Sequence, residues 1–360
     1  MRKEILFAIA AGAIFGLVIA FGIWRVNTSD KSTAVSDIKE ELKEVVGIKN
    51  GIGITIAKPE QNQVLTTNTV LVTGITKPNT WVVLTAEEED YLLKSDEKGE
   101  FEKEVDLIGG INEIIAFSFD ENGNSEKDSL LVVYSSEFIE NGKTDEEEKE
   151  ENTDNEATDS SDAIREKVKE EVNKAQTIAR AYIGTITDIS ENTIQITKFV
   201  IDKEMDSSGE IQQISFKKET VFVDVKEESK EINVSDVAIG DFVIAMGYKN
   251  GNNVLEASRI LITDTIEPSD RVAFVSTVVE VDTDLLSATI NPSNEEVTIE
   301  PMKSIVVTAN IDDTLTEIDF DEIEEAEEMI VVGYKNGDTV EARTIHIISE
   351  KVTDSPEEEE

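Results

Sequence analysis

The hydrophobic pattern begins with one long uncharged stretch, residues 5–24 (ILFAIAAGAIFGLVIAFGIW). At a rise of about 1.5 Å per residue, a helix of this length spans the roughly 30 Å hydrocarbon core of a bilayer. The pattern therefore predicts a single transmembrane helix. Because Arg2 and Lys3 precede it, the positive-inside rule predicts a cytoplasmic end (1–4) and a chain that faces outward from Val26 onward. The alternative is a cleaved secretory signal, which the length of the stretch disfavours.

Small residues recur along this predicted helix. Ala8, Gly12, Gly16 and Ala20 are spaced every four residues and so lie on one face, where a second backbone could approach closely. This face could pair two copies of the chain into a homodimer within the lipid bilayer, but we favour the alternative below. The alternative is that small residues are simply common in such anchors.

Two further stretches have the three-to-four-residue apolar period of an amphipathic helix. One lies in the juxtamembrane stalk 25–51, where Ser36 can cap a short helix that ends at Gly47. The other spans residues 161–179. Its apolar stripe consists of Ile164, Val168, Val172, Ala175 and Ile178 or Ala179. We expect this second helix to dock on the β domain that follows it.

From residue 52 to residue 135, apolar and polar positions alternate, and turn residues interrupt the pattern about every eight to twelve positions. Short segments such as VLVTG (70–74) and WVVL (81–84) are typical of half-buried strands. Several short strands at this spacing predict a β-sandwich.

The residues of this domain also resemble a known family. The segments concerned are VLVTGITKPNTWVVL (70–84), DEKGEF (96–101), GINEI (110–114), FSFDENGNS (117–125) and LLVVY (130–134). In this order they resemble the bacterial immunoglobulin-like domains attached to secreted glycosidases and surface proteins. The resemblance implies a seven-strand sandwich over residues 52–135 that serves as a spacer or binding module and carries no catalysis.

The remaining apolar pattern is duplicated. An offset of 86 residues aligns EINVSDVAIGDFVIAMGYKNG (231–251) with EIDFDEIEEAEEMIVVGYKNG (317–337) without a gap. Repetition of this kind is the signature of a tandem domain. We therefore predict two copies of a small β-barrel, similar in general to an OB fold, over residues 180–265 and 266–349.

Each copy contains the pentapeptide GYKNG between two apolar runs. Asn-Gly is the strongest short hairpin signal, because both residues accept the positive φ of a type I′ turn. The sequence therefore predicts two structural hairpin turns, one at Asn250-Gly251 and one at Asn336-Gly337.

The first copy also resembles a bacterial family of small barrel-like repeats of unassigned function. The matching residues are Gly184, Ile186, Gly240, Asp241, Val243, Gly247, Ala257, Arg259 and Ile260. The second copy departs from the pattern, since Ser276 and Ala326 replace Gly184 and Gly240, and its arginine, Arg343, is shifted by one place. The departures favour a shared scaffold over a shared site.

Charge limits the partners. The chain has 78 Asp and Glu against 33 Lys and Arg, a formal net charge of −45, which repels phosphate backbones, so we expect no nucleic-acid partner. Acidic residues dominate segment 136–160, which we expect to be a disordered linker, and the tail 350–360.

The chain has no cysteine, so no thiolate metal site can form. Its one histidine, His346, is interpreted as an ordinary strand residue, and a single histidine cannot form a two-histidine metal site.

Calcium is the one metal that the sequence suggests. Asp120, Asn122 and Asn124 alternate as ligands in a calcium loop would, but the glutamate that completes a twelve-residue loop is missing. The alternative is a hairpin turn with Gly123 at positive φ, which explains the same residues and which we favour.

The predicted fold class is mainly β and multidomain, with an N-terminal transmembrane helix, an immunoglobulin-like β-sandwich, an acidic linker and helix, and two OB-like β-barrel repeats. No catalytic constellation and no cofactor motif is present in the sequence. We therefore expect no enzyme, but a single-pass cell-membrane protein that presents β domains outward and binds an envelope protein or polysaccharide. The alternatives are a calcium-responsive adhesin and, ranked lower, an accessory protein of a carboxylate-dependent glycoside hydrolase.

Overall fold

The structure is a computed structural model, and it describes residues 53–138, 178–201, 209–226, 228–282, 285–311 and 314–351. Contacts between Cα atoms divide the chain into Met1–Gly53 and Ile54–Glu360, so every described residue except Gly53 belongs to the second unit. Several predicted features lie outside the described residues: the transmembrane segment 5–24 with its small face (Ala8, Gly12, Gly16, Ala20), the stalk 25–51, and residues 139–177 of the linker and docking helix.

The regular elements among the described residues are strands, apart from two short 3-10 helices, η1 (Val234–Asp236) and η2 (Phe320–Glu322). No helix among these residues is long and apolar enough to cross a membrane. For the described residues, the predicted fold class is therefore wrong in its helical part; these residues include only 178 and 179 of the predicted docking helix and none of the predicted transmembrane helix. At the end of the predicted docking helix, the Ala179 carbonyl accepts a hydrogen bond from the Val64 amide (2.9 Å). Residues 178 and 179 themselves are not helical.

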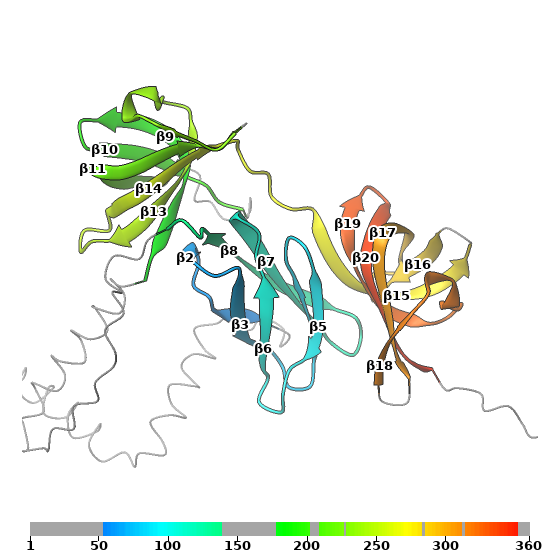
Figure 1. Cartoon of the computed structure of the whole chain (residues 1–360). Helices are drawn as coiled ribbons and strands as arrows, with labels where there is room; N and C mark the ends of the chain where they lie inside the picture. Colours follow the sequence, from blue (N-terminus) through cyan, green and yellow to red (C-terminus); the bar gives the residue numbers. More distant parts are fainter. Residues whose placement is uncertain are drawn as a thin grey trace, which may run out of the picture. The chain divides into compact units, whose positions relative to one another are not determined.

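The first β-module, which we call the sandwich, has two sheets whose apolar faces meet (Figure 1). One sheet has the order β1-β3-β6, with β1 (Thr55–Lys58), β3 (Thr69–Ile75) and β6 (Glu100–Asp106). The other has the order β2-β8-β7-β4-β5, with β2 (Gln63–Leu65), β8 (Ser125–Tyr134), β7 (Gly110–Phe119), β4 (Trp81–Thr85) and β5 (Asp90–Lys94). The core between them includes Val72, Val82, Leu84, Phe101, Ile114 and Val132.

Strand β7 is apolar on both faces. Ile114 and Ala116 belong to the core of the sandwich, whereas Ile115, Phe117 and Phe119 belong to a separate buried cluster on the opposite face. A strand that is buried on both faces is a nearly continuous apolar run, without the alternation of a half-exposed strand. The outer face of this sheet is therefore covered by other parts of the chain.

The second β-module, barrel 1, is a five-strand ring with the order β9-β10-β11-β14-β13, closed by the pairing of β13 with β9 (Figure 1). Its strands are β9 (Arg180–Ser190), β10 (Thr193–Lys198), β11 (Ile211–Asp224), β13 (Phe242–Lys249) and β14 (Leu255–Thr263), and β12 (Lys230–Ile232) pairs with β11 outside the ring. Alternate inward side chains fill the barrel, among them Tyr182, Ile194, Ile214, Val243 and Ile260.

The third β-module, barrel 2, repeats this arrangement. The ring order is β15-β16-β17-β20-β19, with β19 paired to β15. Its strands are β15 (Arg271–Val281), β16 (Leu286–Ile290), β17 (Glu295–Ile311), β19 (Glu328–Asn336) and β20 (Thr339–Lys351), and β18 (Thr314–Ile318) pairs with β17. Each ring has one parallel pair, β11–β14 in barrel 1 and β17–β20 in barrel 2. A 3-10 helix precedes β13 in barrel 1 and β19 in barrel 2, so it occupies the same place in both barrels.

A glycine holds the same position in each barrel. A methyl group on Gly247 would lie 2.0 Å from the Glu256 carbonyl oxygen, and one on Gly333 would lie 2.2 Å from that of Glu341. Such separations leave no room for any side chain, so only glycine fits at this close approach of two strands.

The two hairpins do not have the predicted Asn-Gly type I′ turns. Between β13 and β14 the residue at positive φ is Asn253 (60°), and neither Asn250 nor Gly251 is in the left-handed region. Asn250 instead accepts hydrogen bonds at Oδ1 from the amides of Asn252 (3.0 Å) and Val254 (3.1 Å). An asparagine side chain that closes its own turn removes the need for left-handed backbone at that residue.

In barrel 2 the hairpin is tighter. Asn336 still pairs with Thr339 as part of the ladder, and Gly337, at φ 64°, begins the turn. The turn of barrel 2 is thus displaced by one residue from the predicted pair, Asn336-Gly337.

Each barrel packs on the outer face of the second sheet of the sandwich. At barrel 1, a buried hydrophobic cluster around β2 and β8 joins Val64, Leu131, Val133 and Phe138 to Ala181, Ile183, Phe242, Ile244 and Met246 of the barrel. Around β4 and β7, a second such cluster combines Val83, Ile115, Phe117 and Phe119 with Ala273, Val275, Ile330 and Val332 of barrel 2. Both barrels use the same pair of strands for this contact, β9 with β13 and β15 with β19. We call these contacts joint 1 and joint 2.

Candidate functional site

The parallel pair of barrel 1 is interrupted at one point. Phe216 of β11 pairs with Ala257 of β14, but the next pair is Val221 with Arg259, so four residues (217–220) lie opposite Ser258 alone. Extra residues in one strand bend it and redirect nearby side chains. We call this irregularity break 1.

Barrel 2 has the same irregularity at the same place. Pro301 of β17 pairs with Ala342 of β20, and the next pair is Val306 with Thr344, so four residues lie opposite Arg343 alone. We call this break 2. The duplicated fold therefore has two equivalent sites, and each has one arginine and one hydroxyl residue in consecutive positions: Ser258 with Arg259 at break 1, and Arg343 with Thr344 at break 2.

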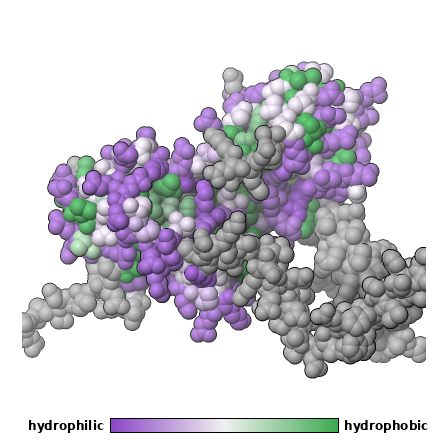
Figure 2. Space-filling model, turned by 180° about the vertical axis from the view of Figure 1, so that it is seen from behind, coloured by the Kyte–Doolittle hydropathy of each residue, from purple (hydrophilic) through white to green (hydrophobic). Residues whose placement is uncertain are grey.

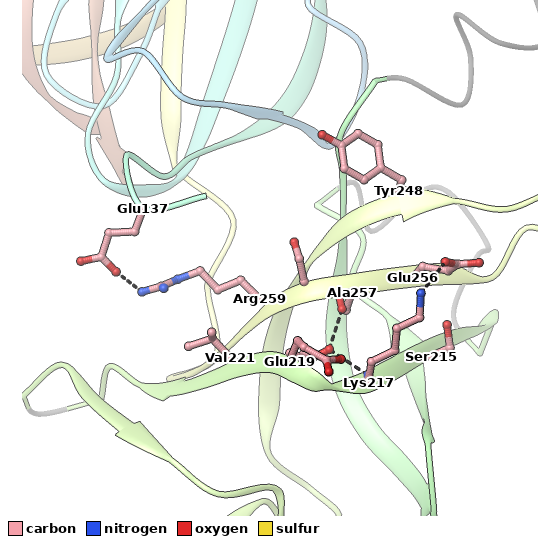
Figure 3. Close-up of a pocket in the computed structure, with 11 residues that line it drawn as sticks. Glu137, Ser215, Lys217, Glu219, Val221, Tyr248, Glu256, Ala257 and Arg259 are labelled. Carbon is pink, nitrogen blue, oxygen red and sulfur yellow. Dashed lines mark hydrogen bonds and ion pairs between the residues drawn. The ribbon is translucent and has the colours of Figure 1, made fainter. Parts of the chain in front are cut away.

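A pocket of about 320 Å³ lies at break 1 (Figure 3). Strands β11 and β14 line most of it, and Tyr248 and Glu137 complete it. The charged lining residues are Lys217, Arg259, Glu137, Glu219 and Glu256. A pocket of this volume is in the range of small ligand sites, and its mixture of both charges with hydroxyl groups suits a polar ligand.

Two ion pairs cross the pocket. Arg259 Nη2 contacts a carboxylate oxygen of Glu137, and Lys217 Nζ lies 3.4 Å from Glu256 Oε2. The Arg259 side chain is only 15% exposed, whereas that of Glu137 is 68% exposed. Arg259 Nε is buried and has no hydrogen-bond partner among the described residues. Nε–H lies on the same edge of the guanidinium as Nη2, so Glu137 satisfies only part of that edge.

The arginine of break 2 is fully engaged with the sandwich. Arg343 Nε donates to Asp90 Oδ2 (2.9 Å), and Nη2 contacts the other oxygen of the same carboxylate. The guanidinium also donates to Thr85 Oγ1 (2.9 Å) and to the carbonyl oxygens of Ala86 (2.8 Å) and Glu87 (3.0 Å). Burial opposes the charged form, but the hydrogen bond and charge of Asp90 outweigh it, so the pKa of Arg343 is raised. These contacts hold the β4–β5 turn against barrel 2.

The neighbouring hydroxyl takes part in the same recognition. Thr344 Oγ1 donates to Asp90 Oδ2 at 3.0 Å. Asp90 is almost completely buried, with 1% of its side chain exposed. Break 2 thus binds one aspartate through the guanidinium and the hydroxyl of consecutive residues.

A second arginine supports joint 2. Arg271 is buried and donates from Nη2 to the Glu113 carbonyl oxygen (2.8 Å), and it lies 3.3 Å from Glu87 Oε1 and 3.4 Å from Glu113 Oε2. Its Nε donates to Ser269 Oγ (2.8 Å). Burial raises the pKa of Glu113, and the positive charge of Arg271 only partly offsets that effect.

The three residues of the predicted calcium loop form the turn between β7 and β8. Asp120 Oδ1 accepts hydrogen bonds from the amides of Asn122 and Asn124 (2.9 Å each), and its Oδ2 accepts one from Asn124 Nδ2 (2.9 Å). Gly123 has φ 83°. The carboxylate oxygens are therefore used inside a hairpin turn, the alternative that the sequence left open. Across the described residues, no group of three or more His, Cys, Asp or Glu side chains could hold a metal ion.

His346 lies in β20 at joint 2. Its side chain is buried, its ring meets that of Trp81 edge-on at 4.8 Å between centroids, and its Nδ1 lies 3.0 Å from Thr308 Oγ1. Burial, with the nearby charge of Lys94, lowers the pKa of His346 to about 4. The imidazole is neutral at pH 7 and is part of the packing.

Sequence reasoning identified both arginines but gave them no role. The signal was the one-place shift of Arg343 relative to Arg259. The structure explains it: the hairpin from Gly247 to Ala257 is one residue longer than that from Gly333 to Ala342, so Arg343 takes the place of Ser258. The partners of both arginines are more than 100 residues away in sequence, and no local pattern could reveal them.

No known family and no curated protein matches the chain. Several solved structures are weakly similar. A Ca²⁺-stabilised adhesin that helps an Antarctic bacterium bind ice is 12% identical over 83% of this chain and 74% of its own, with a TM-score of 0.17. A 1.5-MDa bacterial ice-binding adhesin, in a structure that concerns its retention at the host cell surface, is 10% identical over 84% and 98%, with a TM-score of 0.18.

Trypsin-activated alpha-2-macroglobulin from Escherichia coli is 6% identical over 85% of this chain and 24% of its own, with a TM-score of 0.21. TM-scores this low carry no argument about the fold or function of this chain. Its function has to be inferred from its own geometry.

Proposed function

We propose that this protein is a non-catalytic binding protein exposed at the cell surface, in which the sandwich holds two barrels and barrel 1 offers its pocket to a partner. The observation that carries the proposal is the contrast between the two breaks. Break 2 is closed by a buried aspartate of the sandwich, whereas break 1 is closed by Glu137, a mostly exposed side chain.

The joints support a presenting role. Each barrel buries an apolar face against the sandwich, and buried apolar area is the main favourable term in such contacts. Arg271 and Arg343 add charge-assisted hydrogen bonds at joint 2. A barrel fixed in this way presents its free surface in a constant orientation.

The exposed surface supports recognition through polar groups. The face in Figure 2 is mostly hydrophilic, with small separate hydrophobic areas. The large exposed hydrophobic side chains of the described residues include Leu71, Ile211, Ile239, Val279 and Leu315, which belong to different strands and turns. Scattered residues of this kind do not form the contiguous apolar patch that marks a hydrophobic interface.

Export from the cytoplasm is part of the proposal. The uncharged stretch 5–24 follows Arg2 and Lys3, and a hydrophobic N-terminal stretch after basic residues directs the following chain into the export pathway. The proposal of a non-catalytic role rests on the barrel site: its two cations, Arg259 and Lys217, are paired with Glu137 and Glu256, and the single histidine is buried in joint 2.

Protease treatment of intact cells tests the exposed location. We expect protease added outside to cleave the chain and to leave a cytoplasmic control protein intact. A chain that stays uncut until the cells are lysed would contradict the proposal. Turnover of wall polysaccharide or peptide by the purified chain, lost in Arg259→Ala, would contradict the non-catalytic role.

A further inference from the structure

We propose that the pocket at break 1 binds a carboxylate-bearing turn of a partner protein, in the way that break 2 binds the β4–β5 turn of its own chain. This inference rests on the proposed binding function and names the ligand class of that same site. The ligand is a short peptide turn that presents an aspartate or glutamate together with free carbonyl oxygens.

Break 2 shows what this part of the barrel recognises. Arg343 holds both oxygens of Asp90 and also donates to carbonyl oxygens of the turn, while Thr344 donates to the same carboxylate. A planar guanidinium with five donors matches a carboxylate on one edge and carbonyl oxygens on the other. The recognised unit is therefore an acidic turn and not an isolated ion.

Break 1 contains the same two chemical groups in reversed order. Ser258 and Arg259 are consecutive in β14 opposite the insertion in β11, as Arg343 and Thr344 are in β20. Both Ser258 and Arg259 line the pocket. The buried Nε of Arg259, which has no partner among the described residues, provides a donor that an incoming carbonyl or carboxylate oxygen can use.

The present partner of Arg259 can be exchanged. Glu137 makes one contact with the guanidinium and is 68% exposed, whereas Asp90 at break 2 is 1% exposed and accepts from two residues. Glu137 returns to water at little cost when an equivalent carboxylate replaces it, because its side chain is already mostly exposed. A ligand carboxylate can therefore take the position of Glu137 at Arg259.

The opposite side of the pocket suits a peptide backbone. Lys217 and Glu219 extend from β11, and Glu256 lies across from Lys217 (Figure 3). The carboxylates of Glu219 and Glu256 can accept hydrogen bonds from ligand amides, and Lys217 can donate to a ligand carbonyl. The five charged groups of the pocket sum to −1, and once a ligand displaces Glu137 the four that remain, Lys217, Arg259, Glu219 and Glu256, sum to zero, so the pocket itself does not repel an acidic ligand.

The probe for the test is a cyclised peptide with the sequence of residues 84–91 (LTAEEEDY), the turn that Arg343 holds. Fluorescence anisotropy of the labelled peptide with the full chain, at about 0.15 M salt, measures the dissociation constant. We expect saturable binding. It should weaken about tenfold or more in Arg259→Ala, and also when asparagine replaces the one aspartate of the peptide.

Two further variants separate recognition from stability. Arg259→Lys keeps the charge but loses the planar fork, and we expect it to weaken binding as well. Glu137→Gln removes the competing carboxylate, and we expect it to tighten binding several-fold. Lys226→Ala is the matched control, because Lys226 pairs with Asp241 (3.0 Å) outside the pocket, and it should leave the affinity unchanged.

Binding that survives in both arginine variants, or that weakens in Glu137→Gln, would overturn the proposal, and so would the absence of any binding. If the peptide fails to bind while external protease still cleaves the chain on intact cells, only the ligand class is wrong. If protease also fails to reach the chain, the surface function is wrong as well.

Discussion

Barrel 1 and barrel 2 have the same strand order and use the same strands to contact the sandwich, yet they use break 1 and break 2 differently. At break 2 the arginine is locked onto a buried aspartate of the sandwich. At break 1 the arginine meets an exposed glutamate beside an open pocket. The comparison teaches that one scaffold can supply a structural joint in one copy and a binding site in the other.

The length of one hairpin accounts for much of this difference. A hairpin that is one residue shorter places Arg343 at the unpaired position of the break, where the other barrel has Ser258. Arg259 lies at the next position along its strand, the position that Thr344 occupies in barrel 2. The change of role therefore follows from the register of β14 and β20 and not from a change of fold.

The largest expected effect separates the two arginines. Arg343→Ala leaves Asp90 buried without a cation, which costs about 3–5 kcal/mol, whereas Arg259→Ala leaves Glu137, a mostly exposed carboxylate, in water and costs about 1 kcal/mol or less. Urea unfolding of both variants gives the two free energies. Equal losses would show that the two breaks are energetically alike and that the comparison is wrong.

The apolar parts of the two joints should behave alike. Ile244 and Ile330 occupy matching positions in β13 and β19, and both are buried against the sandwich. We expect Ile244→Ala and Ile330→Ala to cost about 2–4 kcal/mol each in the free energy of unfolding. Val279→Ala, at a position that is mostly exposed, is the control and should cost almost nothing. A large loss in only one of the two isoleucine variants would mean that only one barrel is docked.

Acid should weaken joint 2 through His346. His346, whose place in barrel 1 is taken by Leu261, has its pKa lowered to about 4 in the folded chain, below the ordinary value of about 6.5. The unfolded chain therefore binds the proton first. The stability that His346 contributes is complete above pH 6.5 and is lost as the pH falls toward 4, by up to about 3 kcal/mol.

The measurement is urea unfolding between pH 7 and pH 4, with His346→Leu as the matched variant. Both chains lose stability from their carboxylates, so the informative quantity is the difference between them. We expect this difference to change between pH 6.5 and pH 4 in favour of the variant. A constant difference would show that folding does not shift the pKa of His346.

The smallest effect concerns a turn that the two copies build with different residues. Gly240 has φ 97°, and Ala326 at the equivalent position has φ 66°, a conformation that costs an alanine about 1 kcal/mol. Ala326→Gly should therefore raise the thermal midpoint slightly, and Gly240→Ala should lower it. The loss in Gly240→Ala comes from the backbone conformation alone, because no atom lies within 4 Å of the added methyl group. Changes of the same sign in both variants would contradict the strain that we assign to Ala326.

The alternation of apolar and polar residues predicted strands in each module, because every second side chain of a strand points to the same face of its sheet. It also contained an overlooked sign of docking, because runs such as Ile114 to Phe119 are apolar on both faces and need a second covering surface. Both predicted hairpins are present, but the first does not have the type I′ geometry, because the Asn250 side chain closes its own turn. The contacts of Arg343 and Arg271 join residues more than 150 positions apart, and pairing at that distance leaves no periodic trace.

The most direct test observes both arginines in one sample. The Nε–H resonances of Arg259 and Arg343 can be followed by NMR while the acidic turn peptide is added to the full chain. We expect the Arg259 signal to move with the peptide concentration until it saturates, because its Nε has no partner among the described residues, and the Arg343 signal to stay in place, because its Nε–H is bound to Asp90. Movement of the Arg343 signal, or no movement of the Arg259 signal, would contradict the assignment of break 1 as the binding site and break 2 as the joint.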